Sequence, residues 1–445
     1  MPLRVTVRIA RAYLEALVLG DRIKPFQAAK RRVFARYHIL GTKYDRVFTA
    51  ITYRMFRLLG IVDKIIAERI GRIDYPTPVM QALRLAVMVS QFDTVGDRVF
   101  SESLIENLAR IIESEYPGMG ELVVRLYKSL EKEPWSPSTK LEELEYRLLL
   151  PRILVEELQK LLPPGEVEEF AKAVNTDRPT LGFRVNRLKA SVEEIIEELQ
   201  YAGVDAWPST RIPYHVSYKG SLNYSRFKPL LEGKVVPQDE ASAAAGYLLG
   251  AKPGELIVDM CAAPGGKTTH LAELSALGAR IVAIDVFIDR LERLIELATR
   301  TGTWPSIYPV RSDAIFASRY VRDRVDRVLL DPPCTSTGAL AKHPEARWRL
   351  TREAIVRHVG LQRRLLLEAV KLLKPGGLLL YTVCSVLPEE GEENIKWLLE
   401  TVKGIEIVPL TGPYDPSPLL PGTMRAWPHR HGTTGFFYAL LERKE

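Results

Sequence analysis

The sequence predicts an α/β protein whose C-terminal half is a parallel β-sheet covered by helices on both faces. From about residue 235 to the end, short apolar runs that end in polar residues alternate with helical patterns. Residues 1 to about 130 instead carry apolar residues at helical spacing, and residues 141–233 combine helical segments with short strands. A chain of 445 residues is long enough for two or three domains, each with its own core.

These changes of pattern divide the chain into three predicted domains. They are a helical domain over residues 1–135, a small α+β unit over 141–233 and the sheet domain over 234–445. The segment 132–140 contains two prolines, and we interpret it as the linker between the first two domains.

In the helical domain, apolar residues recur on one predicted helix face, at Val47, Ile51, Met55, Leu58 and Leu59. Residues that commonly end helices are expected to separate the segments, and these are Pro25, Gly41, Gly60, Pro76 and Pro117. The pattern therefore predicts a succession of helices packed around one core.

The net charge is distributed unevenly along the chain, and most of the positive charge lies near its start. Residues 1–70 hold fifteen Lys or Arg and five Asp or Glu, a balance of +10, so the remainder of the chain sums to −3. A basic block of this kind indicates a polyanionic partner, and nucleic acid is the usual one. The alternative interpretation is a basic helical face that only contacts solvent.

The middle unit begins with a predicted strand over residues 181–186. Ser191 is followed three residues later by Glu194, the spacing of a capping box, which predicts the start of a helix. Gly203 is expected to end that helix. Strand, helix and strand in this order are typical of a small α+β unit.

Composition excludes several classes of protein. No apolar run reaches the roughly 18 to 20 residues that a membrane span needs, and the N-terminus lacks a signal-peptide core. We therefore expect a cytoplasmic protein that does not enter a membrane. The three cysteines show no CxxC spacing, so neither a structural metal nor a disulfide framework is expected.

In the sheet domain, continuous apolar strands are predicted over residues 256–259, 280–285, 327–331 and 377–384, and the segments 406–410 and 435–443 are expected to complete the sheet. Ligands of such sheets bind at the carboxyl ends of the strands. The residues of chemical interest all follow a strand at this end, which predicts one site there.

The loop after the first of these strands, residues 261–267, is rich in small residues and precedes a helix. It lets backbone amides approach a ligand. The alternative is a phosphate-binding P-loop, because Gly266, Lys267 and Thr268 fit that motif. Cys261 occupies the place of its first glycine, and Pro264 is inserted, which argues against a nucleotidase. The interpretation as a dinucleotide dehydrogenase has even less support, because the GxGxxG motif is absent.

Carboxylates follow the next two strands. Asp285 ends its strand one βαβ unit after the glycine loop, where a carboxylate accepts hydrogen bonds from ribose hydroxyls. Asp313 follows the next predicted strand, and by itself it has the pattern of a turn residue.

Two cysteines are expected at neighbouring strand ends. Asp331 is followed by two prolines and Cys334, and Cys384 ends the next strand. Either cysteine alone would more often be a small core residue, but two of them facing a cofactor loop indicate chemistry. A low-pKa thiolate that adds to carbon 6 of cytosine makes carbon 5 nucleophilic, and a nearby acid and base complete the reaction.

Taken together, these motifs resemble the Sun family of RNA 5-methylcytosine methyltransferases. The similarity covers roughly residues 180–445, including CAAPGGKT, DPPC, TVCS and PEEGEENI. The resemblance implies a Rossmann-like methyltransferase domain that uses S-adenosylmethionine. Thr335, Val383 and Thr434 depart from the usual family pattern, and no role is assigned to Thr434.

The family's site roles carry over by position. Cys384 resembles the nucleophile, Cys334 the residue that helps to release the product, and Asp331 the residue that hydrogen-bonds the target cytosine. The residues implied to bind the cofactor are Cys261, Ala262, Ala263, Pro264, Gly265, Gly266, Lys267, Asp285, Arg290, Asp313 and Asp331. Asp285 would bind the ribose, Arg290 would lie near the cofactor's carboxylate and Asp313 beside the adenine.

The N-terminal helices resemble the NusB-like RNA-binding domain of bacterial small-subunit rRNA methyltransferases. This resemblance favours rRNA over tRNA as the substrate, and we expect a monomer that binds RNA and needs no metal. The alternatives are a tRNA 5-methylcytosine methyltransferase and a non-catalytic RNA-binding assembly factor.

Overall fold

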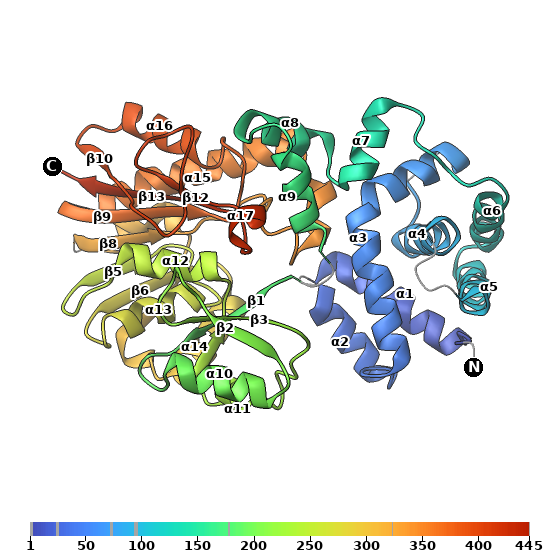
Figure 1. Ribbon diagram of the computed structural model, residues 1–445, viewed down its shortest axis with the longest axis horizontal. Coiled ribbons are helices and arrows are strands. Elements are labelled where there is room, and N and C mark those ends of the chain that lie inside the picture. The colour runs from blue at the N-terminus through green and yellow to red at the C-terminus, as the bar shows by residue number, and fades with distance from the viewer. Residues whose placement is uncertain are drawn as a thin grey trace. The chain divides into compact units, whose positions relative to one another are not determined.

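The computed structural model describes residues 3–23, 26–71, 74–92, 97–176, 179–322 and 324–444. The chain forms two compact units (Figure 1). The first, here called the helical unit, comprises Met1–Arg152 and His343–Trp348. The second, here called the sheet unit, comprises Ile153–Lys342 and Arg349–Glu445. The division of the sheet unit near residue 233 into two domains stays a prediction.

The helical unit is built from amphipathic helices, in agreement with the sequence pattern. They are α1 (Val7–Arg22), α2 (Phe26–Arg36), α3 (Lys43–Ile70), α4 (Thr77–Gln91), α5 (Arg98–Glu115), α6 (Met119–Lys132) and α7 (Lys140–Leu148). Thr6, Thr42 and Asp97 cap three of them by accepting a hydrogen bond from a first-turn amide. The core surrounds Phe48, whose ring stacks 3.9 Å from that of Tyr13.

The expectation that Gly60 ends a helix is wrong, because α3 continues through it to Ile70. A Cβ at Gly60 would lie 2.2 Å from the ring of Trp348, which packs against the helix there. The Trp348 indole donates a hydrogen bond of 2.8 Å to the Arg57 carbonyl. This glycine therefore makes room for a side chain rather than a turn. Pro25, which is also expected to separate helices, lies outside the described residues.

The segment interpreted as a linker connects α6 to α7 without regular structure, and it is fixed to the helical unit. Trp135 is buried, and its indole donates to Glu68 at 2.7 Å. Its backbone N–H donates to Gln91 at 2.8 Å, and its carbonyl accepts from the same amide side chain. The segment between α6 and α7 is therefore anchored to the helical unit by Trp135.

The sheet unit begins with α8 (Arg152–Leu161) and α9 (Glu166–Val174), followed by a four-stranded antiparallel sheet in the order β2-β3-β1-β4. Its elements are β1 (Leu181–Val185), α10 (Val192–Tyr201), β2 (Asp205–Pro208), β3 (His215–Lys219), α11 (Lys228–Leu231) and β4 (Val235–Pro237). The small α+β unit predicted from the sequence has this strand and helix order.

The helix α10 starts as predicted, with the Ser191 hydroxyl accepting from the Glu194 amide. The reciprocal half of a capping box is not formed, because the Glu194 carboxylate pairs with Lys234 at 2.7 Å instead. Gly203 follows the helix in a left-handed conformation with φ of 74°, which a glycine adopts without strain.

The large sheet has the order β11-β12-β13-β9-β8-β5-β6-β7, and β10 pairs with β13. The strands are β5 (Leu256–Asp259), β6 (Arg280–Asp285), β7 (Ile307–Arg311), β8 (Val325–Leu330), β9 (Leu373–Val383), β10 (Ile405–Val408), β11 (Asp415–Pro416), β12 (Met424–Ala426) and β13 (Phe436–Arg443). Strands β5 to β9 pair in parallel, and β13 runs antiparallel to β9. The predicted strands are confirmed.

Helices cover both faces of this sheet (Figure 1). The helices α12 (Glu240–Leu249), α13 (Gly266–Leu274) and α14 (Ile288–Thr301) pack with Ile257 and Leu329 in one core. The helices α15 (Arg352–Leu372) and α16 (Glu392–Thr401) pack with Val258 and Val328 in the other. Neighbouring residues of one strand thus face opposite cores, as expected for a parallel sheet buried on both sides.

This architecture is a Rossmann-like α/β fold that follows the helical segments in the chain, in agreement with the predicted fold class. Strands β5, β6 and β7 follow one another outward in one direction, and β8 and β9 follow in the other. The strand order therefore reverses between β5 and β8, which is where such sheets bind ligands. Within the described ranges, no helix has the length and hydropathy that crossing a bilayer requires.

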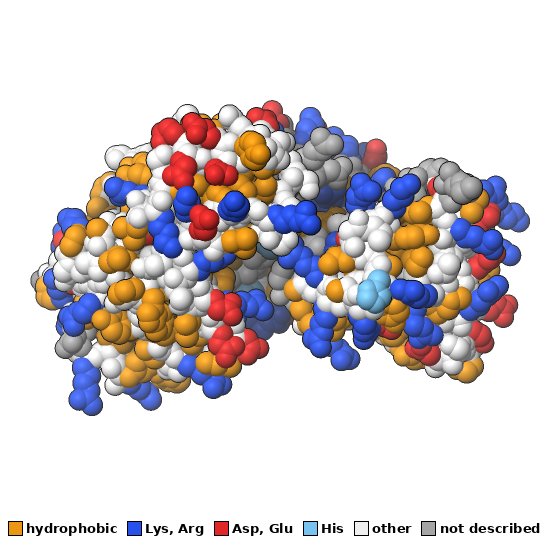
Figure 2. Space-filling model, turned by 90° about the horizontal axis from the view of Figure 1, so that it is seen from below, with side chains coloured by type: hydrophobic (Ala, Val, Ile, Leu, Met, Phe, Trp, Pro, Cys, Tyr) orange, Lys and Arg blue, Asp and Glu red, His pale blue; other side chains and the backbone are white. Residues whose placement is uncertain are grey.

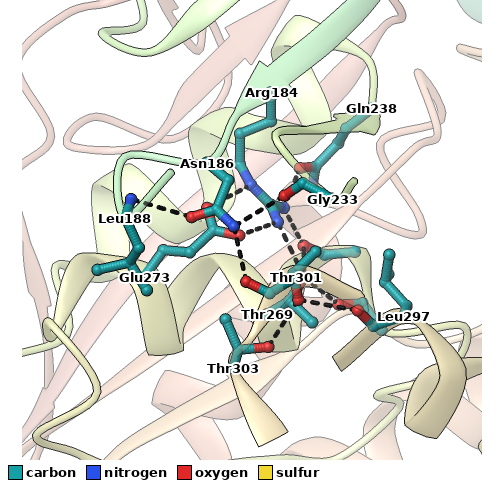
Figure 3. Close-up of polar contacts among 12 residues, drawn as sticks. Arg184, Asn186, Leu188, Gly233, Gln238, Thr269, Glu273, Leu297, Thr301 and Thr303 are labelled. Atoms are coloured by element: carbon teal, nitrogen blue, oxygen red, sulfur yellow. Dashed lines mark hydrogen bonds and ion pairs between the residues drawn. The ribbon is translucent and has the colours of Figure 1, made fainter. Parts of the chain in front are cut away.

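A buried ion pair joins the small sheet to the helix α13 (Figure 3). Arg184 of β1 donates to both oxygens of Glu273, at 3.0 and 2.8 Å, and each side chain is 1% exposed. The same guanidinium donates to the Thr269 hydroxyl at 2.9 Å, to the Gln238 amide oxygen at 2.6 Å and to the Gly266 carbonyl. One arginine therefore fixes the start of α13 relative to β1.

Replacing Arg184 by alanine is expected to lower the free energy of unfolding by about 3 to 5 kcal/mol, because the Glu273 carboxylate would stay buried without its partner. The double variant Arg184→Met/Glu273→Leu should lose much less, since both charges leave together. Urea unfolding of the full chain, followed by circular dichroism, measures both. A single variant as stable as the double variant would contradict this role.

Candidate active site

The predicted cofactor loop lies between β5 and α13, at the point where the strand order reverses. The loop folds back on itself through a hydrogen bond of 2.8 Å from the Gly265 N–H to the Ala262 carbonyl. Gly265 has φ of 101°, and a Cβ there would lie 2.9 Å from the Leu294 side chain, so only glycine fits. The first-turn amides of α13, at Gly266 and Lys267, have no acceptor within the helix and are available to a ligand.

Asp285, at the end of β6, lies beside this loop and is 5% exposed. One carboxylate oxygen accepts from the Ala263 N–H at 3.3 Å, and the other from the Phe287 N–H at 3.0 Å. Arg290 of α14 lies 3.4 Å from the same carboxylate and donates to the Ala263 carbonyl. The structure thus brings Asp285, Arg290 and the loop together, as the sequence predicted.

Asp313 follows β7, next to the end of β6. Its carboxylate accepts from the Ile315 N–H at 3.1 Å and caps the short helix η2 (Ala314–Arg319). The adjacent Ser312 N–H donates to the Asp285 carbonyl at 3.2 Å. Asp313 is therefore a turn residue that lies close to Asp285, and its place beside a bound cofactor stays a prediction.

Lys267 connects the loop to the strand end at β8. Its ammonium pairs with Asp331 at 2.6 Å and lies 5.6 Å from the centre of the Phe436 ring. Below it, Asp259 accepts from the Thr268 hydroxyl at 2.7 Å, and burial raises the pKa of Asp259 to about 7. Lys267 therefore links the loop after β5 to the end of β8, where Asp331 precedes the segment that carries Cys334.

The structure brings Cys334 and Cys384 into contact, with their sulfur atoms 3.1 Å apart. Cys384 follows β9, and Cys334 lies on the loop that follows β8. The Ser336 hydroxyl is 3.6 Å from the Cys384 sulfur. Cys261 is not part of this pair, and burial raises the pKa of its thiol well above the usual range.

The two thiols differ in their acidity. The pKa of Cys384 is lowered because its sulfur accepts a hydrogen bond from Cys334, with further help from Ser336 and the Lys267 charge. The pKa of Cys334 is raised well above its usual range by donating that bond, by burial and by the nearby Glu390 carboxylate. The directions of the two shifts favour a thiolate on Cys384 over one on Cys334.

Sequence reasoning missed a buried network that holds the Cys334 loop. Glu390 is fully buried and accepts from the Thr335 N–H at 3.0 Å, from the Thr335 hydroxyl and from Gln362 at 2.9 Å. The Asn394 amide donates to the Gln362 oxygen at 2.9 Å, and Gln362 also donates to the Pro333 carbonyl at 3.0 Å. The motif PEEGEENI contains Glu390 and Asn394, so it carried this signal without revealing the partners.

Chemically, the site combines a glycine-containing loop at the start of a helix, carboxylates at the next strand ends and two thiols in contact, with the pKa of Cys384 lowered and that of Cys334 raised. Within the described residues, no group of His, Cys, Asp and Glu side chains is arranged to hold a metal ion. With the order of the strands, this arrangement defines a Rossmann-like methyltransferase with paired cysteines at its centre.

Comparison with known proteins places the chain within this class. Residues 246–442 match the model of the 16S rRNA methyltransferase RsmB/F family, and residues 150–222 match the ferredoxin-like domain of RsmF/B-like methyltransferases. Ribosomal RNA small subunit methyltransferase B of Klebsiella pneumoniae strain 342 is 30% identical over 366 residues, covering 82% of each chain. The chain therefore belongs to the RsmB/F family, which confirms the resemblance to the Sun family.

Solved structures agree with this assignment. The crystal structure of PH0851 is 41% identical, with a TM-score of 0.91, and the match covers 99% of this chain and 100% of that one. A methyltransferase homologue from Pyrococcus horikoshii is 29% identical with a TM-score of 0.61, over 69% of this chain and all of that one. The alternative of a P-loop nucleotidase is excluded by this membership.

The acidity of Cys384 should depend on Cys334. Alkylation of Cys384 by iodoacetamide is expected to fall as the pH drops through its pKa, because only the thiolate reacts. In the Cys334→Ala variant the midpoint should move to higher pH, since the thiolate loses its hydrogen-bond donor. Mass spectrometry of the Cys384 peptide over a pH series measures this midpoint.

Cys261→Ala is the matched control, because Cys261 is not in contact with the pair, and its midpoint should equal that of the wild type. An unchanged midpoint in Cys334→Ala would show that the contact between the thiols does not control the acidity of Cys384.

Proposed function

We propose that this chain transfers a methyl group from S-adenosylmethionine to carbon 5 of a cytosine in RNA, with Cys384 as the covalent nucleophile. The observation that carries the proposal is the contact of 3.1 Å between two thiols of opposite pKa shift at neighbouring strand ends. Membership in a family of 16S rRNA methyltransferases favours rRNA over tRNA as the substrate.

The residues at the ends of β5 and β6 fit S-adenosylmethionine, which when bound supplies an electrophilic methyl group. A Cβ at Gly266 would meet nothing closer than 3.7 Å, so the backbone is open to a ligand there. The loop from Cys261 to Lys267 would hold the cofactor, and each Asp285 oxygen retains a lone pair for a ribose hydroxyl. Arg290 would lie near its carboxylate and Asp313 beside its adenine.

The cysteines and Asp331 would act on the cytosine. The Cys384 thiolate forms a bond to carbon 6, and the electron pair displaced from the C5–C6 bond makes carbon 5 nucleophilic. Asp331, held by Lys267, hydrogen-bonds the ring edge of the base. After carbon 5 gains the methyl group it loses its proton to a base, and the carbon–sulfur bond breaks as the double bond returns. Cys334, in contact with Cys384, assists this release.

Methyl transfer from radiolabelled S-adenosylmethionine to small-subunit rRNA and to total tRNA, followed by nucleoside analysis, tests the proposal. We expect 5-methylcytosine in rRNA. Label in tRNA alone would make the chain a tRNA methyltransferase. If neither RNA is labelled as free RNA or as a ribosomal precursor particle, while the chain still binds RNA, it is an assembly factor and the proposed activity is wrong.

Substituting the two cysteines should have different effects. Cys384→Ala is expected to lower methyl transfer by roughly 10³-fold or more, as the loss of a covalent nucleophile does, while cofactor binding measured by calorimetry stays intact. Cys334→Ala should still attack but release slowly, so an enzyme–RNA adduct should accumulate on a denaturing gel. Normal turnover by Cys334→Ala, without adduct, would remove Cys334 from the mechanism.

The helical unit would bind RNA phosphates through a basic groove. This groove, of about 630 Å³, lies between α1, α2, α4 and α5, and its charged rim consists of Arg11, Arg22, Arg32, Arg36, Glu15 and Glu115. Arg11 pairs with Glu115 and Arg36 with Glu15, whereas Arg22 and Arg32 have no acidic partner among the residues that the structure describes. Figure 2 shows how widely Lys and Arg side chains cover the visible face of the helical unit.

Reversing the charge at both unpaired positions, Arg22→Glu/Arg32→Glu, should weaken RNA binding and lower the slope of log affinity against log salt by roughly 1 to 2. Cofactor binding should not change. The matched control Arg125→Glu/Lys128→Glu makes the same charge change on the exposed side of α6. Equal salt slopes for the two double variants would show that the groove does not bind RNA.

A further inference from the structure

The small antiparallel sheet has one apolar face and one polar face. Phe183, Val185, Val216 and Tyr218 form the apolar core with α10. Because side chains alternate along a strand, Gly182 and Arg184 of β1 and His215 and Ser217 of β3 point to the other face. Arg184 and His215 are buried on this second face. The next row across the strands, which contains Gly182 and Ser217, lines a pocket.

This row consists of three residues that lie side by side on neighbouring strands. In the register of the sheet, Gly182 pairs with Ser217, and Ser217 pairs with Trp207. We call these three residues the shelf. A Cβ at Gly182 would lie 2.4 Å from the His215 ring, so the position stays without a side chain. The shelf therefore presents a flat surface of a glycine and a serine, bounded by an indole.

The shelf forms one wall of a pocket of about 280 Å³. The other walls come from the loop after β2, the start of α12 and the segment after α17 (Pro428–His431), with Thr210, Arg211, Asp239, Glu240 and Thr433 among the lining residues. This volume is slightly below the usual range for small-molecule sites, roughly 300 to 1,000 Å³, and it suits one nucleobase rather than a larger ligand.

The acidic residues of the pocket are neutralised by neighbours. The Glu240 carboxylate accepts from Arg211 at 2.8 Å and from the Ser209 hydroxyl at 2.6 Å. The Asp239 carboxylate pairs with Lys342 and accepts from the Thr433 hydroxyl at 2.7 Å. An anionic RNA strand is therefore not repelled from this pocket, and its walls are fixed before a ligand enters.

Several polar groups that line the pocket lack partners. Among the residues that the structure describes, the Trp207 indole N–H and the hydroxyls of Ser217 and Thr210 make no hydrogen bond. His215, which is 1% exposed, uses Nε2 to bond the Gln238 carbonyl at 3.1 Å, and its Nδ1 is buried without a partner. Unused donors and acceptors beside an aromatic ring match the edge and the face of a nucleobase.

The pocket is connected to the reacting cysteine through short contacts within the sheet unit. Asp239 accepts from the Thr434 N–H at 3.2 Å, and the next residue, Gly435, donates to the Gly338 carbonyl at 2.9 Å. The Gly338 N–H in turn donates to the Cys384 carbonyl at 3.1 Å. A nucleotide in the pocket would thus be near the nucleotide that Cys384 attacks.

We propose that this pocket binds an unpaired nucleotide of the substrate RNA close to the target cytosine, with its base stacked on Trp207 over the shelf. The inference rests on the proposed function for the identity of the ligand. The shelf then acts as a second base site, which helps to hold the strand in position while the target base enters the active site.

Binding of a fluorescein-labelled, unstructured RNA decamer with a central cytosine, measured by anisotropy on the full chain, tests this site. Trp207→Ala should raise the Kd for the decamer at least about fivefold, the smallest effect that the loss of one stacked base produces. Trp207→Phe should retain most of the affinity. Ser217→Leu, which fills the pocket without removing a described hydrogen bond, should also raise the Kd.

Trp304→Ala is the matched control, because Trp304 is an exposed tryptophan (42%) next to β7 of the other sheet, and its Kd should equal that of the wild type. Calorimetry with S-adenosylmethionine should give the same affinity for all variants, which shows that they are folded. With an RNA that the wild type methylates, Trp207→Ala should raise KM more than it lowers kcat.

The proposal is overturned if Trp207→Ala and Ser217→Leu both bind the decamer like the wild type, or if the wild type does not bind it. A failure of the proposed function would give another result. The wild type would then methylate no RNA, while the Kd values for the decamer would still differ between the variants in the expected order.

Discussion

The buried guanidinium of Arg184 is the interaction on which the arrangement of the sheet unit depends. It reaches from the small sheet to the start of α13 and satisfies Glu273, Thr269 and the Gly266 carbonyl together. Gly182 lies two residues earlier on the same face of β1 and forms part of the shelf. One strand therefore positions the cofactor loop and the proposed second base site, so the two are held in a fixed relation.

The reactive groups depend on a second constraint, the reversal of strand order between β5 and β8. It brings Lys267 from the loop after β5 to Asp331 at the end of β8, while β9 delivers Cys384 beside Cys334. The hydrogen bond between the two thiols lowers the pKa of Cys384 and raises that of Cys334, and burial and the nearby Glu390 carboxylate raise the pKa of Cys334 further. Two chemically identical side chains in contact thus have pKa values shifted in opposite directions.

Much of this arrangement could be predicted from the sequence because it follows from local pattern. Apolar runs that end in Asp285 or Cys384 indicate strands, and parallel strands place their carboxyl ends together. The partners of Glu390 could not be predicted, because Glu390 lies in the turn before α16, whereas Gln362 lies in α15 and Thr335 in the segment after β8. The shelf was missed because it is created by the register of three antiparallel strands, and the expected break at Gly60 failed because a distant side chain occupies the space.

That last contact has a consequence for how the family can vary. Since a Cβ at Gly60 would collide with the Trp348 ring, any larger residue at position 60 requires a smaller one at position 348. Two positions far apart in the chain are thereby expected to change together among relatives. A substitution that is harmless in one homologue would be damaging in another, depending on which residue its counterpart carries.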